Sequence, residues 1–477
     1  MRSVRGVGNA LANESLLVVV FAGFLGVAAI LVPYQLSSDG WFALVAGRFV
    51  AHHGLPHHDS LAALTAGREW VDQQWLGHLA IYGVGAGGGL RLVVGLNVLL
   101  VVGAFGAACA YGRRRGGQPT TVALITLLGL LPFAAAAFGV RAQSLVYLPF
   151  VVLVALLLRP TGLKWVRTFM LLALVVIWAN VHGSVLLAAG LVSLRGAVEL
   201  IERRTKTAER QWWLMLVGPW VCLIVSPYQL HVVSYYARTA FNSSFATYLS
   251  QWAPTTFSPI SATLLVLAFA TVWVLGRAAG VYSTYERCLL VIGVLLAFVA
   301  VRQWAFAALL LIMLVPVGMD SALRKRPPRR APVVGAAIAI AAGASALAGI
   351  VVVLSAPVTD LTRSYPNAAA DLAAAAAARS GAPIYGGVQY SDWLLWRHPE
   401  LAGRVVFDVR YELLRRSEVK RLVLFDAGSG IDKPLGKPGV FVLDPDVEKQ
   451  AVTGLRPDVR TVYNTDHVVV AVKRDES

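Results

Sequence analysis

The chain has 477 residues, of which 57% are hydrophobic and only 14% are charged. Soluble globular proteins have about 25% charged residues, so this composition excludes an ordinary soluble protein. The formal net charge is +16, yet residues 357–477 hold 16 basic and 16 acidic residues, so the whole excess precedes them.

Apolar stretches of membrane-spanning length recur between residues 16 and 355. A run of about 20 apolar residues is long enough to cross a bilayer as a helix. We therefore expect a polytopic α-helical membrane protein with about 11 transmembrane helices. The predicted spans are residues 16–33, 92–111, 120–138, 143–158, 168–181, 184–201, 212–226, 259–276, 285–301, 303–319 and 332–355.

The basic residues of this part alternate between loops, with 20 in one set of loops and 6 in the other. Loops rich in Lys and Arg stay in the cytoplasm, so we expect a cytoplasmic N-terminus. After an odd number of spans, the C-terminal segment lies outside. The positive charge thus reflects membrane topology and not nucleic-acid binding, because no basic stripe interleaves with aromatic residues in a soluble part.

This topology divides the chain into two predicted domains. Residues 1–356 form the transmembrane domain, with a large first outer loop at residues 34–91 that contains helical spacing over 41–52 and 75–84. Residues 357–477 form an extracytoplasmic α/β domain, because short apolar strands alternate with helical segments. We expect helices at 368–378, 392–396, 412–420 and 446–454, and strands at 384–388, 404–409, 421–425, 439–443, 461–463 and 467–472.

Ionisable residues at the outer membrane face are candidates for chemistry, because charge near the membrane is costly and usually kept for function. Asp39 follows the outer end of the first span, in Ser37-Ser-Asp-Gly-Trp41. A carboxylate there can take a proton from an incoming hydroxyl group as a general base. The alternative is an ordinary helix N-cap for the segment that begins at Trp41.

Single basic residues at outer span ends form a second group of candidates. Arg141 and Arg302 each open an apolar span, and His182 lies between two short spans. An arginine can bind a lipid phosphate through two parallel hydrogen bonds. The alternatives are arginines that snorkel to lipid headgroups and a buried histidine with satisfied hydrogen bonds.

The stretch Ala51-His-His-Gly-Leu-Pro-His-His-Asp-Ser60 holds four of the nine histidines. His57, His58 and Asp59 offer imidazole and carboxylate groups, which are suitable ligands for a divalent metal ion such as zinc. Adjacent histidines point apart in regular backbone conformations, so they do not easily share one ion. The alternative is a Gly-x-Pro turn in which Asp59 has a structural part.

Motifs spread over most of the chain resemble the polytopic glycosyltransferases of the GT-C superfamily. More narrowly, the chain resembles bacterial membrane proteins related to the family 39 protein mannosyltransferases. The motifs are Asp39-Gly-Trp41 with Gly47-Arg48, Gly54-Leu-Pro-His-His-Asp-Ser60, Trp70 with Gln74-Trp-Leu76, Arg141-Ala-Gln143, Trp178-Ala-Asn-Val-His-Gly183, Ser226-Pro-Tyr228, Gln251-Trp252, Arg302, Val406-Phe-Asp-Val-Arg410 and Asp466-His467.

The resemblance implies an inverting transferase in the bacterial cytoplasmic membrane. Its donor is a polyprenyl-phosphate sugar in the outer leaflet of the lipid bilayer, and its acceptor is a glycan, a lipid or a protein. No nucleotide or metal is required. The implied roles are catalysis for Asp39, auxiliary acids for Asp59 and Asp72, donor-phosphate binding for Arg141, Arg302 and His182, and acceptor or sugar binding for Trp41, Trp75, Trp252 and Arg410.

Three positions depart from the pattern of the superfamily. Gly40 stands where a second acidic residue is common, and Gln74 and Gln251 stand where glutamates are expected before Trp75 and Trp252. The missing carboxylates keep open a non-catalytic scaffold or lipid-binding subunit of an envelope-assembly complex. A transporter of lipid-linked sugar is a further alternative, although such proteins usually show inverted repeats with broken spans in both halves.

Overall fold

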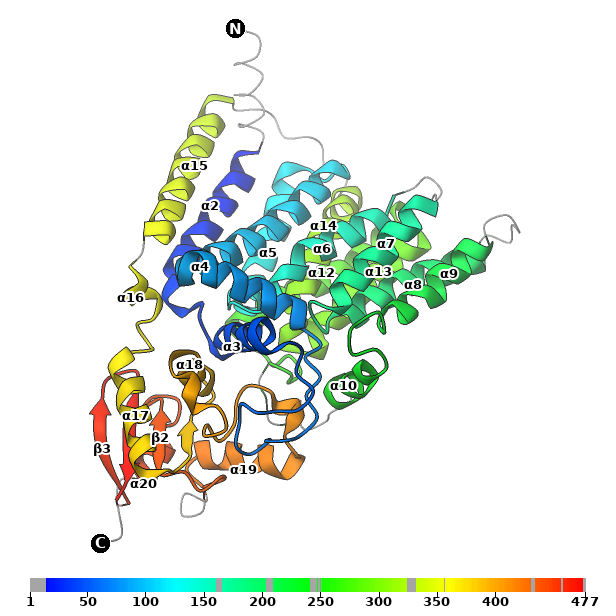
Figure 1. Cartoon of the computed structure of the whole chain (residues 1–477). Helices are drawn as coiled ribbons and strands as arrows, with labels where there is room; N and C mark the ends of the chain where they lie inside the picture. Colours follow the sequence, from blue (N-terminus) through cyan, green and yellow to red (C-terminus); the bar gives the residue numbers. More distant parts are fainter. Residues whose placement is uncertain are drawn as a thin grey trace.

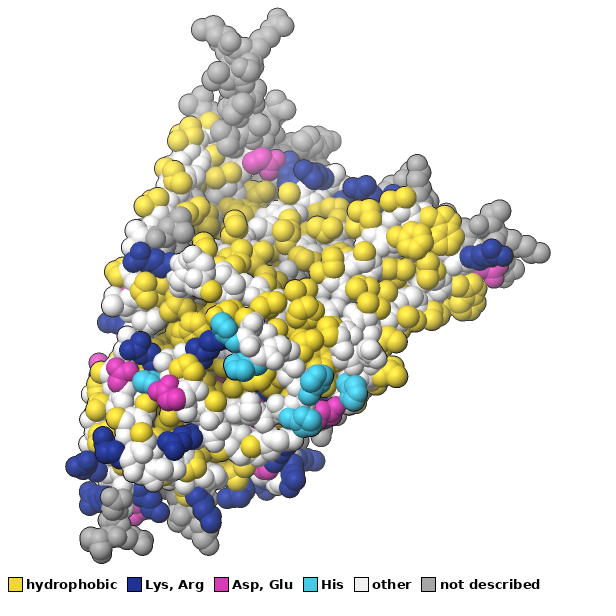
Figure 2. All heavy atoms as spheres, viewed as in Figure 1, with side chains coloured by type: hydrophobic (Ala, Val, Ile, Leu, Met, Phe, Trp, Pro, Cys, Tyr) yellow, Lys and Arg dark blue, Asp and Glu magenta, His cyan; other side chains and the backbone are white. Residues whose placement is uncertain are grey.

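The computed structural model describes residues 14–159, 165–202, 209–240, 247, 249, 251–323, 332–355, 357–429, 434–455 and 458–474. Long helices fill one end of the molecule, and a four-stranded sheet with its own helices lies at the other end (Figure 1). Helices α3, α10 and α18 lie between these two parts (Figure 1). Hydrophobic side chains cover much of the outside of the long helices, as Figure 2 shows.

A helix lies at every one of the 11 predicted spans. By length and composition, five helical segments of the described ranges can cross a membrane: Trp75–Arg114, Pro119–Ala137, Pro259–Val281, Val301–Ala322 and Gly335–Val352. The helices of this part are α2 (Ser15–Ile30), α3 (Ser38–His53), α4 (Trp75–Arg114), α5 (Pro119–Ala137), α6 (Ser144–Leu157), α7 (Trp165–Ala179), α8 (Val185–Glu202), α9 (Glu209–Cys222), α10 (His231–Ala240), α12 (Pro259–Ala278), α13 (Thr284–Val299), α14 (Trp304–Ala322) and α15 (Pro332–Ser355), with the short turns η1 (Val32–Tyr34), η2 (Ala279–Val281) and η3 (Val301–Gln303).

Helix α14 is the central helix of the bundle. Every side chain from Trp304 to Pro316 is buried, as expected for a helix that is hydrophobic on all sides. Glycines let neighbouring helices approach it closely. A Cβ atom added to Gly112 of α4 would lie 2.8 Å from the carbonyl oxygen of Ile312.

Helix α4 extends the predicted second span into the first outer loop. The helical spacing predicted over residues 75–84 is present as the first part of α4. A kink at Gly89 separates it from the rest, because this residue has φ 71° and ψ −177°. Glycine adopts such a positive φ without the steric cost that a Cβ atom would add.

The first outer loop and the C-terminal part share one hydrophobic core. Buried side chains of α3, such as Trp41 and Phe42, pack in the same cluster as Leu394 of α18. The guanidinium of Arg48 donates hydrogen bonds to the carbonyl oxygens of Leu395 and Trp396, at 2.6 and 3.0 Å. The loop is therefore a structural partner of the C-terminal part.

The C-terminal sheet has the strand order β1-β2-β4-β3. Strand β1 pairs with β2 in parallel, and β4 pairs antiparallel with both β2 and β3. All four side chains of β2 are buried, which is typical of a central strand covered on both faces. The elements are α16 (Val358–Leu361), α17 (Asn367–Ser380), β1 (Ile384–Gly386), α18 (Ser391–Arg397), η4 (Pro399–Leu401), η5 (Tyr411–Leu413), α19 (Arg416–Asp426), β2 (Val440–Leu443), α20 (Lys449–Leu455), β3 (Val459–Asn464) and β4 (Val469–Lys473).

Two predicted strands of this part are wrong. Residues 421–425 belong to α19, whose buried side chains Val419, Leu422 and Phe425 recur every three residues, as on one face of a helix. Residues 404–409 form only single bridges, through Val405. The chain turns away after them because the carboxylate of Asp408 accepts a hydrogen bond from the backbone N–H of Arg410 at 2.9 Å.

The first outer loop pairs with the edge of the sheet through its backbone. Val405 bridges Ile384 of β1 on one side and Ala62 on the other. The backbone N–H groups of Ala63 and Leu64 donate to the carbonyl oxygens of Val405 and Val406, at 2.7 and 3.0 Å. These bonds cover an edge that would otherwise expose unpaired backbone groups.

Candidate active site

A cavity of about 640 Å³ lies where the helix ends meet the C-terminal part. Its walls come from the start of α3, from the segments 141–143, 182–184, 251–252 and 302–303, from α10, and from the segment 409–412 with α19. Ligand pockets of small molecules usually have a volume of about 300–1,000 Å³. The cavity brings together Asp39, Arg141, His182, Trp252, Arg302 and Arg410 from the predicted site.

Asp39 lies in the first turn of α3 and faces the cavity. The alternative of a helix N-cap is wrong, because Ser37 occupies that position and α3 begins at Ser38. The Asp39 side chain is 35% exposed, and its Oδ2 atom lies 3.8 Å from Nε of Arg141. The carboxylate therefore has room to contact a ligand while it stays close to a positive charge.

The packing around position 40 gives a steric reason for a glycine there. A Cβ atom there would lie 3.1 Å from the carbonyl oxygen of Val140 and 3.2 Å from its Cβ atom. The segment before Arg141 therefore packs directly on the first turn of α3. A larger side chain at position 40 would require this segment to shift by a few tenths of an ångström.

Arg141 and Arg302 place two guanidinium groups on the same cavity. Nη1 of Arg141 donates to Oε1 of Gln251 at 3.3 Å. The guanidinium of Arg302 lies 3.9 Å from the ring centre of Trp252, and its backbone N–H donates to the carbonyl oxygen of Gln251 at 3.0 Å. Gln251 is neutral and adds no charge beside Arg141, whose guanidinium lies 3.8 Å from Asp39, whereas a glutamate at position 251 would add a second carboxylate there.

His182 is buried, with a relative exposure of 5%, and lines the cavity. Its Nδ1 atom accepts a hydrogen bond from the backbone N–H of Ser184 at 3.0 Å. The hydroxyl oxygen of Ser184 also lies 2.8 Å from this atom. With Nδ1 acting as an acceptor, the proton of the neutral imidazole is on Nε2, which leaves His182 one N–H donor.

Of the three predicted aromatic residues, only Trp252 lines the cavity. Trp41 is 1% exposed, and its ring packs edge-on against Tyr365 with the centres 5.2 Å apart. The Nε1 atom of Trp75 donates to Oδ1 of Asn180 at 2.8 Å. Both residues therefore hold elements that surround the cavity.

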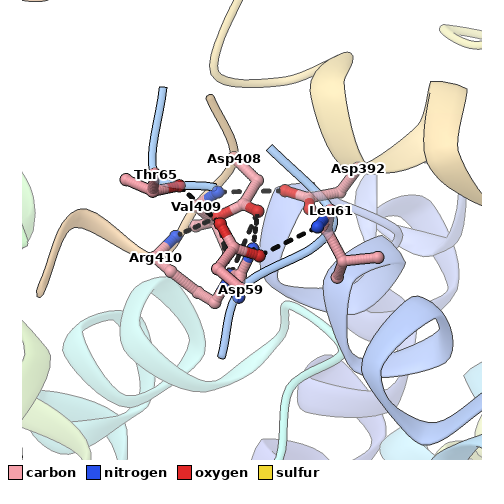
Figure 3. Close-up of polar contacts among 7 residues, drawn as sticks. All are labelled: Asp59, Leu61, Thr65, Asp392, Asp408, Val409 and Arg410. Atoms are coloured by element: carbon pink, nitrogen blue, oxygen red, sulfur yellow. Dashed lines mark hydrogen bonds and ion pairs between the residues drawn. The ribbon is translucent and has the colours of Figure 1, made fainter. Parts of the chain in front are cut away.

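Asp59 lies outside the cavity, in a buried network with Arg410 (Figure 3). Its Oδ1 atom accepts from Nη2 of Arg410 at 2.7 Å and from the backbone N–H of Leu61 at 2.9 Å, and its Oδ2 atom accepts from Thr65. Asp408 binds the same guanidinium through both carboxylate oxygens. Asp59 therefore holds the loop against the C-terminal part.

Asp72 also lies outside the cavity. Its carboxylate contacts Nδ1 of His78 at 2.9 Å, and His78 itself lines the cavity. Neither Asp72 nor Asp59, the two predicted auxiliary acids, is among the residues that line the cavity. Asp72 instead fixes the orientation of a cavity histidine.

The candidate metal site at His57, His58 and Asp59 does not form. The Asp59 carboxylate is bonded to Arg410, Leu61 and Thr65, and the His57 ring packs against Tyr228 with the centres 5.9 Å apart. Within the described ranges, no group of three or more His, Cys, Asp or Glu side chains is arranged to hold a metal ion.

Two carboxylates on the C-terminal wall were not predicted. Glu412 lies in η5 and Asp426 at the end of α19, and both line the cavity. Burial raises the pKa of Glu412 to about 7; the charges of Asp408 and Asp72 add to the rise, while its own backbone N–H and Arg410 oppose it. The sequence pattern around Glu412 predicts only the start of a helix, so nothing in it marks this residue.

The Oδ1 atom of Asp426 accepts a hydrogen bond from the hydroxyl of Tyr385 at 2.8 Å. Burial raises the pKa of Asp426 to about 6, although this hydrogen bond works in the opposite direction. Tyr235 of α10 lies within electrostatic reach of both Glu412 and Arg302. The cavity is therefore lined by Arg141, Arg302 and Asp39 from the helical part and by Arg410, Glu412 and Asp426 from the C-terminal part.

No protein-family model and no characterised protein matches the chain by sequence. Solved structures do match it by fold. AglB from Archaeoglobus fulgidus, an archaeal oligosaccharyltransferase in complex with an inhibitory peptide and a dolichol-phosphate, has a TM-score of 0.54 at 11% identity, over 97% of this chain and 74% of that chain. The apo form of the Archaeoglobus fulgidus oligosaccharyltransferase gives a TM-score of 0.50 at 10% identity, with the same coverage of 97% and 74%.

The chain has the GT-C fold. ArnT from Cupriavidus metallidurans, bound to undecaprenyl phosphate, is also similar, with a TM-score of 0.47 at 16% identity over 95% of this chain and 98% of that chain. The predicted resemblance to the GT-C superfamily is thus confirmed at the level of the fold. The narrower resemblance to the family 39 proteins stays a prediction.

Proposed function

We propose that the protein is a bacterial membrane glycosyltransferase that moves a sugar from a polyprenyl-phosphate donor to an acceptor outside the cytoplasm. The observation that carries this proposal is the meeting of Asp39, Arg141 and Arg302 at one cavity. The one carboxylate and two guanidinium groups of these residues have a net positive charge, which suits the singly charged phosphodiester of such a donor. AglB, which has the same fold, was solved with a dolichol-phosphate, and this supports a lipid-phosphate donor.

In the proposed reaction, an acceptor hydroxyl oxygen attacks the anomeric carbon of the donor sugar. The bond from this carbon to the phosphate oxygen breaks, and the electron pair leaves with the polyprenyl phosphate. Asp39 takes the hydroxyl proton as general base. This is a single displacement, so the configuration at the anomeric carbon inverts.

The departing phosphate gains negative charge, and stabilising such charge is usually a large part of catalysis. Arg141 and Arg302 are the groups that we assign to this role, with Nε2–H of His182 as a further donor. The stacking of Arg302 on Trp252, at 3.9 Å, keeps its guanidinium plane in place without using its hydrogen-bond donors. Such preorganisation avoids the cost of reorienting donors during the reaction.

The proposed orientation places the N-terminus in the cytoplasm and the C-terminal part outside, in the bacterial cytoplasmic membrane. The cavity then lies at the outer surface, within reach of a donor in the outer leaflet. The charge pattern of the loops supports this orientation. The α/β arrangement of residues 357–477 serves as the outer cover of the cavity in this proposal.

The test is transfer from radiolabelled undecaprenyl-phosphate hexoses by the purified protein, compared with the Asp39→Asn variant. We expect the variant to remain folded and to lose transfer. Native mass spectrometry of the same samples detects any polyprenyl phosphate that co-purifies with the protein. Retained lipid with no transfer by the wild-type protein would instead favour the non-catalytic, lipid-binding subunit, while full transfer by Asp39→Asn would exclude Asp39 as the base.

A further inference from the structure

The segment Arg410–Glu412 carries the guanidinium of Arg410 and the carboxylate of Glu412 within three residues, and both residues line the cavity. Arg141 and Arg302 of the proposed phosphate site line the same cavity. A hydroxyl group donates one hydrogen bond and also accepts hydrogen bonds. A donor and an acceptor side by side are therefore complementary to a hydroxyl-rich ligand.

The donor is Nη1 of Arg410. The Arg410 side chain is 3% exposed, and its other nitrogen atoms bind Asp59 and Asp408 (Figure 3). Its guanidinium also lies 4.1 Å from the ring centre of Trp70. Nη1 alone is buried without a hydrogen-bond partner among the described residues. A buried donor without a partner is costly, so a ligand oxygen at this atom would remove that cost.

The acceptor is the carboxylate of Glu412. Among the described residues, the hydrogen bond that this carboxylate accepts comes from the backbone N–H of Glu412 itself. Its oxygens therefore keep most of their capacity to accept further hydrogen bonds, since a carboxylate has about four such positions. Tyr235 of α10, which also lines the cavity, lies close to the same carboxylate.

The charge on this wall indicates the class of ligand. The positive charge of Arg410 is offset by Asp59 and Asp408, and Glu412 and Asp426 add further carboxylates at the cavity. A phosphorylated or carboxylated ligand would be repelled here. Tyr235 and Tyr411 also line the cavity, and tyrosine rings offer apolar faces.

We propose that Arg410 Nη1 and the Glu412 carboxylate form the acceptor subsite, and that the acceptor is an uncharged carbohydrate. The proposal rests on the proposed transferase function of the cavity. The donor phosphate binds at Arg141 and Arg302, and the acceptor hydroxyl reaches Asp39 from the C-terminal side. Glu412 binds a neighbouring hydroxyl of the acceptor and not the one that reacts.

The test measures transfer from radiolabelled undecaprenyl-phosphate hexoses to p-nitrophenyl glycosides, in the full-length protein in detergent. We expect Glu412→Ala to raise the acceptor KM by at least about tenfold, the size expected for a lost hydrogen bond to a charged group, with little change in kcat. Glu412→Gln keeps an acceptor oxygen and should raise KM less. Glu400→Ala, at an exposed glutamate bonded to His398, is the matched control and should behave as wild type.

Three outcomes would overturn the subsite. They are an unchanged acceptor KM in Glu412→Ala, a loss of undecaprenyl-phosphate binding in the same variant, and a preference of the wild-type protein for glycoside phosphates or peptides over neutral glycosides. If the wild-type protein transfers nothing, the proposed function fails on its own. Saturation-transfer NMR with the p-nitrophenyl glycosides then still decides the subsite, because binding must occur in wild type and weaken in Glu412→Ala.

Discussion

Replacing Asp59 by alanine separates its structural role from a catalytic one. The substitution removes one of the two carboxylate partners of Arg410 Nη2 and the acceptor of the Leu61 N–H and Thr65 hydroxyl groups. Breaking a buried ion pair by removing one partner usually costs about 3–5 kcal/mol. Since Asp408 still neutralises the guanidinium, we expect a loss of about 3 kcal/mol, at the lower end of that range.

The loop and the C-terminal part share one core, so they should unfold together. For a unit of about 150–250 residues, a loss of 3 kcal/mol lowers the unfolding temperature by roughly 6–12 °C. Tryptophan fluorescence of the purified protein in detergent measures this shift, and Trp70, next to Arg410, is a local reporter. Asp446→Ala, at an exposed aspartate of the same part, is the control and should leave the unfolding temperature unchanged.

A double-mutant cycle with Arg410→Met sharpens the assignment. If Asp59 acts through Arg410, the free energy of unfolding that the double variant loses should be clearly smaller than the sum of the losses in the two single variants. An Asp59→Ala variant that unfolds at the temperature of Asp446→Ala, yet has lost transfer, would refute the reasoning. It would return Asp59 to the role of an auxiliary acid.

Three further predictions concern the cavity. Asp39→Asn should lower kcat by about 10²–10⁴-fold, as for the loss of a general base. Its unfolding temperature should not change, because the Asp39 side chain is partly exposed. A lower unfolding temperature would mean that Asp39 has a structural role. Arg302→Gln should weaken undecaprenyl-phosphate binding by at least about tenfold, measured by native mass spectrometry, and equal retention would count against a phosphate role. The acceptor KM should rise as the pH falls from 8 to 6, because Glu412, with a pKa of about 7, loses its negative charge on protonation. In Glu412→Ala, the acceptor KM should not depend on pH. A pH-independent KM in the wild-type protein would contradict this account.

The sequence predicted the helical part well because membrane helices leave a strong signal. Each span is a continuous apolar run, and the bilayer fixes its length. It predicted the gathering of Asp39, Arg141, His182 and Arg302 for a related reason. These residues all lie at predicted outer ends of spans, so topology alone places them near one surface.

Residues 404–425 show what the sequence could not predict. After Arg421, the run from Leu422 to Phe425 is short and apolar, and such a run fits a strand and a buried helix equally well. The role of Asp59 depends on Arg410, which is 351 residues away in the chain. No local pattern indicates such a pairing, and the same holds for Glu412, whose position on the cavity follows from the packing of η5 against α10.

The packing of α3 between α4 and α18 sets a limit on how this protein can change. Asp39 lies at one end of α3, and Arg48 near the other end binds carbonyl oxygens of α18 and stacks on Trp396 at 4.9 Å. The C-terminal part is therefore not an exchangeable module that could be grafted from a related protein. A chimera joined at residue 357 takes α3 and α18 from different parents, so it should fold only when the facing positions of the two helices still match.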